Sequence, residues 1–166
     1  MLYLFEKFIQ GLTWRTAQAA QVALIIVMAI TVTNVFIRIP WSPMGGAVEL
    51  VEMSGAVLLG LGVAYTAMMK GHIMVGVLVE RFSPRVQALI ELVVSIISLF
   101  FSILLARELL YFAYDRMLAG YVTGHLRLPM APSIYLVAFG FIMFSLVLLL
   151  DMIKAAIIVV KGSETT

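Results

Sequence analysis

Four long apolar stretches dominate the chain, and each is long enough to cross a bilayer. A spanning helix needs about 20 mainly apolar residues, and residues 17–37, 47–69, 86–114 and 133–153 meet that length. Because lipid offers no hydrogen-bond partners to irregular backbone, we expect intact helices. The pattern predicts an all-α integral membrane protein with four transmembrane helices, forming a single membrane domain over residues 1–166.

Two shorter segments place polar and apolar residues at helical spacing. Over residues 1–16, Leu, Phe and Ile side chains share one arc of a helix. The opposite arc holds Tyr3, Glu6, Lys7, Gln10 and Thr13. Such an amphipathic pattern is typical of a helix lying in the membrane interface. Residues 71–83 are half apolar and too short to span, so they predict a second interfacial helix that connects spans two and three.

Composition supports lipid as the natural solvent and excludes several functions. Hydrophobic residues make up 63% and mean hydropathy is +1.11, against roughly 45–50% apolar residues in soluble domains. A net charge of +2 without a Lys/Arg run does not favour nucleic acid. The chain has no cysteine and only two histidines, too few for thiolate metal sites or a di-haem cytochrome. Because no nucleophile–base pair is evident either, we expect no catalytic residue, no metal site and no cofactor in this chain.

Lysine and arginine are divided unequally between the two predicted sides of the membrane. Seven of the 11 lie with the termini and the second loop: Lys7, Arg15, Lys70, Arg81, Arg85, Lys154 and Lys161. The opposite side has Arg38, Arg107, Arg116 and Arg127. Cytoplasmic loops carry the excess of positive residues. Both termini are therefore expected to be cytoplasmic.

Carboxylates and small residues share one face of span two. Glu49 and Glu52 lie one turn apart where the span begins. The face continues through Ala56, Gly60, Val63 and Ala67. Small residues let another helix approach closely, so this face predicts packing. The two carboxylates fit either a proton or cation site, or an interfacial pair with a cation such as Arg38.

Spans one, three and four also carry polar residues at helical spacing. Asn34 and Arg38 indicate a polar seam that reaches the surface at Arg38. Glu91 leads a hydroxyl stripe in span three, which fits helix packing or a water path. That stripe consists of Ser95, Ser98 and Ser102. Asp151 and Lys154 are expected to form a local pair at the end of span four.

Residues that anchor the chain at the membrane surface are expected at the ends of the spans. They are Arg38, Trp41, Lys70, His72, Arg81 and Arg85. Lys70-Gly71-His72 could begin a metal or proton site, but His72 has no second ligand within helical reach. We interpret it as the membrane edge, where span two leaves the bilayer.

Three stretches together resemble the small membrane subunit, the Q subunit, of tripartite ATP-independent periplasmic (TRAP) transporters. They are "NVFIRIPW" (34–41), "ELVEMSGAVLLGLGVAYTAMMKGHIMVGVLVERFSP" (49–84) and "GHLRLPMAPSIYLVAFGFIMFSLVLLLD" (124–151). One position departs from the pattern, since Gly76 stands where the family usually has an acid after His-Ile. Any role of that acid is not carried over to this chain.

The resemblance implies a supporting subunit in a bacterial inner membrane. A periplasmic solute-binding protein would deliver an organic acid, and a large permease subunit would import it with sodium. The residues expected to pack against that partner are Asn34, Glu49, Glu52, Ala56, Gly60, Ala67, Glu91, Ser95 and Ser98. Arg116 and Arg127 are candidate contacts to the binding protein. The alternative is an autonomous small proton-coupled transporter that uses Glu49, Glu52 or Glu91.

Overall fold

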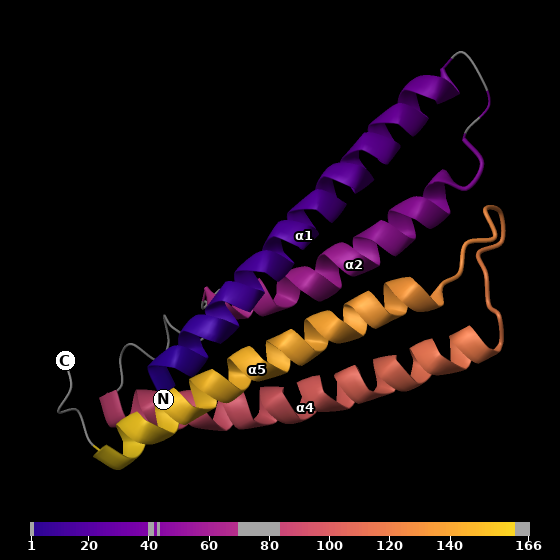
Figure 1. The fold of residues 1–166 in the computed structure, drawn as a ribbon. Coiled ribbons are helices and arrows are strands. Elements are labelled where there is room, and N and C mark those ends of the chain that lie inside the picture. The colour runs from indigo at the N-terminus through magenta and orange to yellow at the C-terminus, as the bar shows by residue number, and fades with distance from the viewer. Residues whose placement is uncertain (1, 40–41, 43, 70–83, 162–166) are drawn as a thin grey trace.

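The structure is a computed structural model and describes residues 2–39, 42, 44–69 and 84–161. Within these residues, four long helices account for nearly all of the chain (Figure 1). They are α1 (Leu2–Arg38), α2 (Ala47–Met68), α4 (Pro84–Leu118) and α5 (Ala131–Lys161). Each contains a stretch long and apolar enough to cross a membrane. The predicted all-α protein with four spanning helices is therefore confirmed.

The two predicted interfacial helices are not confirmed. Residues 71–83 lie outside the described residues. Residues 2–16 are helical, but they continue without a break into the first span as part of α1. Thr13, expected on the solvated arc, is fully buried, whereas Phe8 on the apolar arc is 67% exposed. Amphipathic spacing therefore located a helix but not the surface that it packs against.

The helices differ in length relative to the membrane. At 1.5 Å per residue, the 22 residues of α2 measure about 33 Å, close to the roughly 30 Å hydrocarbon core. The 37 residues of α1 measure about 55 Å and the 35 residues of α4 about 52 Å. These two helices must tilt or extend past the lipid tails. Figure 1 shows α1 running obliquely to the other three.

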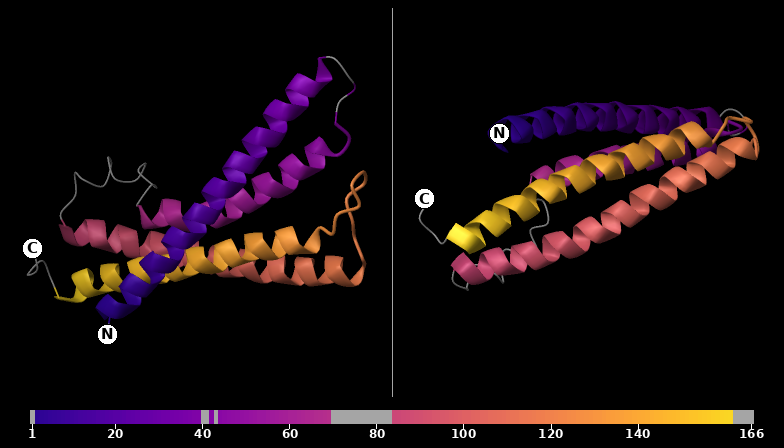
Figure 2. Two further views of the ribbon diagram at one scale, coloured as in Figure 1. Left: turned by 45° about the horizontal axis from the view of Figure 1, so that its top comes forward. Right: turned by 60° about the horizontal axis from the view of Figure 1, so that its bottom comes forward.

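The four helices form a row in the order α1, α2, α5, α4 (Figure 1), and Figure 2 shows α1 crossing the others at an angle. The inner helix α5 contacts all three others, most extensively α4 and α2. Burial follows this order: 33% of the apolar stretch of α5 is buried, but only 11% of that of α1 and of α4. The two outer helices therefore present most of their apolar surface to lipid or to another protein.

Helices α2 and α5 touch backbone to backbone at the centre of the row. A Cβ atom added to Gly140 would overlap the carbonyl of Gly60. A Cβ added to Gly60 would lie 2.8 Å from the Cα of Val137. Small residues permit this close approach, and in lipid they are a main source of helix–helix attraction. The small-residue face predicted on span two is thus used, at Gly60, against a helix of the same chain.

Hydroxyl groups join α4 to α5. Ser102 is buried, and its Oγ lies 2.8 Å from the Oγ of Ser145. The carbonyl of Phe141 lies within hydrogen-bond distance of both hydroxyls, at 3.3 Å from Ser102 and 2.8 Å from Ser145. The two hydroxyl protons are therefore shared among these three contacts. The packing interpretation of the hydroxyl stripe therefore holds at Ser102. Ser95 and Ser98, further along the stripe, are half-buried.

The helix ends gather into two opposite ends of the bundle. The end of α1 and the α4–α5 loop share one end, here called the loop end, and the start of α1 and the end of α5 lie at the other, the terminal end (Figure 1). At the terminal end, Ile9 packs with Ala67, Val147 and Leu150. Lys154 Nζ lies 2.6 Å from Glu6 Oε1, so the cation predicted to pair with Asp151 binds a carboxylate of α1. The Asp151–Lys154 pair stays a prediction.

Gly140→Ala is expected to disrupt the α2–α5 contact, because its new methyl group would overlap the Gly60 backbone. The matched control is Gly62→Ala on α2, where a Cβ atom meets nothing within 4 Å. Helix propensity alone should make that control neutral or up to about 1 kcal/mol more stable. Thermal unfolding of the purified protein in detergent measures both. Equal melting temperatures for the two variants would contradict the close contact.

Candidate functional site

The α4–α5 loop folds back on itself at the loop end as a short hairpin. Val122 and Pro129 form an isolated antiparallel bridge. Inside it, the amide of Thr123 donates to the carbonyl of Leu128 at 2.9 Å, and the amide of Leu128 donates to Thr123 Oγ1 at 3.1 Å. These bonds close the base of the hairpin. Residues 124–127 form its tip.

Glu49 binds the tip of this hairpin from the first turn of α2. Its Oε1 accepts the amide of His125 at 2.5 Å, and its Oε2 accepts the amide of Leu126 at 3.0 Å. Backbone amides at the tip of a hairpin need an acceptor from another part of the protein or from water. A single carboxylate can accept hydrogen bonds from both amides at once. The position also suits a negative charge, because the first turn of a helix carries unpaired N–H groups.

Two glycines make room for the hairpin beside α2. A Cβ atom on Gly45 would overlap the imidazole of His125, and one on Gly46 would overlap the side chain of Leu126. Gly46 also precedes α2 with a φ of 81°, a left-handed conformation that glycine adopts without steric cost. Side chains and backbone of the hairpin tip therefore both contact the segment that begins α2.

Asn34 connects the end of α1 to the same segment. Its Oδ1 accepts the amide of Met44 at 3.0 Å, and its side chain is half-buried. A continuous set of contacts thus runs from α1 through Met44 and Gly45 to His125 of the α4–α5 loop. We call residues 34, 44–49 and 119–130 the loop-end site.

Two arginines carry positive charge at this end: Arg116, which precedes the loop-end site on α4, and Arg127, which lies within it. The Arg116 guanidinium lies 4.6 Å from the ring centre of Phe112 and 4.5 Å from that of Tyr121, both cation–π distances. Arg127 is exposed at the hairpin tip with a φ of 53°, which is uncommon for a residue with a side chain. Of the two arginines predicted as surface contacts, Arg127 is therefore exposed and Arg116 is half-buried.

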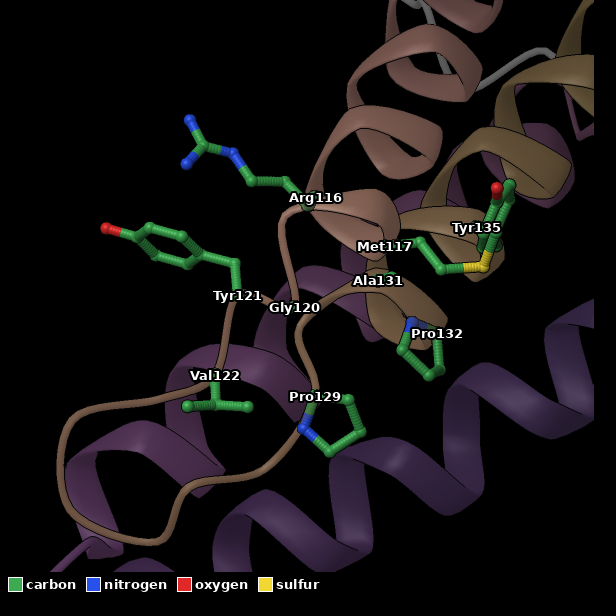
Figure 3. A pocket seen from close by; sticks show the side chains of 9 residues that line it. All are labelled: Arg116, Met117, Gly120, Tyr121, Val122, Pro129, Ala131, Pro132 and Tyr135. Atoms are coloured by element: carbon green, nitrogen blue, oxygen red, sulfur yellow. The ribbon is translucent and has the colours of Figure 1, made fainter.

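A shallow hollow of about 350 Å³ lies beside the base of the hairpin. Its apolar wall includes Met117, Pro132 and Tyr135 (Figure 3). Figure 3 shows the guanidinium of Arg116 and the ring of Tyr121 pointing away from these three side chains. The hollow therefore joins an apolar surface to the loop-end site without placing the arginine charge inside it.

The residues of α2 and α4 that were predicted to pack against a partner differ in their burial. Gly60 and Ala67 are buried within this chain. Glu52 and Ala56 are exposed on α2, and for them partner packing stays a prediction. Glu91 is in α4, but its side chain lies outside the described residues.

The residues predicted to anchor the chain at the membrane surface are described only in part. Arg38 is exposed at the end of α1. Arg85 is the second residue of α4, although its side chain is not among those described. Trp41, Lys70, His72, Gly76 and Arg81 lie outside the described residues.

The partners of Glu49 differ from the expected cation. It binds two backbone amides of a loop more than 70 positions away in the chain, rather than Arg38 across the adjoining loop. His125 was not predicted as part of any site. The Gly45-Gly46 pair just before span two was the available signal, because glycine is favoured where another segment approaches the backbone closely.

A comparison with known protein families identifies the family of the chain. The family described as "Tripartite ATP-independent periplasmic transporters, DctQ component" matches residues 27–157. The chain belongs to this family. The matched region includes the whole loop-end site and the Gly60–Gly140 contact, while residues 2–26 of α1 precede it. No curated protein and no solved structure matched the chain.

DctQ membership makes this chain the small membrane subunit of a TRAP transporter, a multi-pass membrane protein. The family is a transporter component family and not an enzyme family. Within the described residues, no group of three or more His, Asp or Glu side chains could hold a metal ion. The loop-end site consists of the backbone amides of the hairpin tip, the Glu49 carboxylate and the exposed Arg127.

Asn34→Ala is expected to loosen the α1–α2 loop, because the amide of Met44 loses its acceptor. The loss should be about 1 kcal/mol of unfolding free energy, the usual net value of one hydrogen bond. Asn34→Asp keeps an acceptor oxygen and is the matched variant. Unfolding by denaturant in detergent measures both. If the alanine variant is no less stable than the aspartate variant, the Asn34–Met44 bond contributes nothing.

Proposed function

We propose that this chain is a fixed transmembrane support for a large sodium-coupled permease subunit, which imports an organic acid delivered by a periplasmic solute-binding protein. The family match supports a place in such a complex. The observation that carries the supporting role is the exposed apolar surface of the outer helices. Only 11% of the spanning stretch of α1 and of α4 is buried, so a partner subunit can pack there beside lipid.

The row of intact helices favours support over transport by this chain alone. Transported substrates bind at broken helices near the bilayer midplane in many secondary transporters. Here α2 and α5 meet at the centre through glycine backbone, which leaves no space for a substrate between them. Glu49 binds the loop amides from the first turn of α2, away from that midplane. On this proposal the substrate and sodium sites lie in the partner subunit.

The orientation proposed for the chain puts the loop end in the periplasm. Lys/Arg residues are in excess at the terminal end, which the positive-inside rule assigns to the cytoplasm. The loop end then faces the binding protein, and its exposed Arg127 and half-buried Arg116 fit an acidic face on that protein. In a bacterial inner membrane this arrangement lets one subunit contact both of its partners.

A tagged form of this chain, extracted from native membranes in mild detergent, should retain the large permease in equal amount. Identification of co-purified proteins by mass spectrometry measures this. In the complementary experiment, the chain alone in liposomes with an entrapped pH-sensitive dye should show no proton flux above empty liposomes. Flux that Glu49→Gln or Glu52→Gln abolishes would favour the autonomous transporter instead.

The double variant Arg116→Glu/Arg127→Glu should weaken capture of the binding protein by about fivefold or more, since charge reversal in a contact slows association. Co-purification with the permease should stay unchanged. Arg107→Glu is the control, because this exposed arginine lies on α4 away from the loop. Binding of the system's purified binding protein to the immobilised complex gives the measurement. Equal binding to the double variant and the control would contradict the contact.

A further inference from the structure

We infer that Glu49 is a positioning residue that holds the two loops of the loop end together as one rigid docking surface for an acidic face of a soluble protein. The carboxylate reaches from α2 to the amides of His125 and Leu126. It therefore links the segment that begins α2 to the hairpin tip that carries Arg127. The inference rests on the proposed function for the identity of the docking partner.

The hairpin tip takes its shape from outside the loop. Thr123 and Leu128 bond to each other at the base, but the amides of His125 and Leu126 bond to Glu49. Arg127, which follows them, is in the left-handed region at φ 53°. A residue with a side chain keeps that conformation only where its surroundings hold it. Removing the carboxylate thus frees the backbone that presents Arg127.

Shape complementarity strengthens the same link. The imidazole of His125 occupies the space over Gly45, and the Leu126 side chain occupies the space over Gly46. The hairpin tip is therefore held by its backbone through Glu49 and by its side chains through the two glycines. Because Asn34 binds Met44 next to them, the end of α1 belongs to the same rigid unit.

Charge complementarity selects the partner. Glu49 keeps its negative charge, with both carboxylate oxygens bonded to amides of the hairpin tip. Arg116 is half-buried with its guanidinium over Tyr121, and the neighbouring Asp115 is exposed. Arg127 is exposed, so it is the cation that the hairpin tip presents. Such a surface attracts an acidic protein face, and a fixed position for the charges makes the attraction specific.

Hydrogen–deuterium exchange of residues 119–130 tests the positioning role directly. Glu49→Ala should speed exchange of the His125 and Leu126 amides at least tenfold, and Glu49→Gln, with one acceptor oxygen, should fall between alanine and wild type. Glu52→Ala is the control, because its exposed carboxylate lies one turn further along α2. Equal exchange in Glu49→Ala and Glu52→Ala would overturn the inference.

An engineered disulfide is the replacement for the carboxylate link. Since the chain has no cysteine of its own, two introduced cysteines have no competing thiol within it. The pair Gly45→Cys/His125→Cys joins Gly45 to the residue whose imidazole occupies the space over it. In the Glu49→Ala background, the reduced pair should bind the purified binding protein several-fold more weakly than wild type, and oxidation should restore binding. Gly45→Cys alone should not respond to oxidation.

Two results would overturn the inference in different ways. If oxidation does not restore binding to the Glu49→Ala pair although exchange of the tip is slowed, rigidity is not what the partner needs. If wild type binds vesicles of anionic phospholipid through Arg127 but does not bind the protein, the surface recognises lipid headgroups, and the binding-protein contact in the proposed function fails with it. Normal co-purification of the permease in either case leaves the supporting role standing.

Discussion

The backbones of α2 and α5 touch at Gly60 and Gly140, and the rest of the bundle depends on that contact. Lipid tails are as apolar as leucine, so helices in a bilayer gain little from burying large side chains and more from close backbone packing. The two glycines make α2 and α5 the inner pair of the row. Helix α4 then packs on α5 through Ser102, and α1 packs on α2.

The same contact sets the geometry of the loop end. With α2 and α5 fixed at one crossing point, the first turn of α2 lies beside the segment that leads into α5. Glu49 can then reach the amides of His125 and Leu126, and Gly45 and Gly46 can receive their side chains. A central apolar contact therefore positions a polar site at the end of the same helices.

A row of helices suits a support better than a closed bundle does. It leaves the outer faces of α1 and α4 apolar and largely exposed, which gives a large surface for a membrane partner. The inner pair stays closed at Gly60 and Gly140. The loop end adds the exposed Arg127 on a hairpin that Glu49 joins to the start of α2. Membership of the DctQ family is consistent with this division of surfaces between a membrane partner and a soluble one.

The sequence by itself determined the four spans and the small-residue face of α2, because hydropathy and helical spacing are local properties. It also determined the family, through stretches along most of the chain. Tertiary structure alone decided that Gly60 faces α5, that Glu49 binds the hairpin tip instead of Arg38, and that Thr13 is buried. Each depends on a segment distant in the chain, and local spacing does not say which segment arrives there.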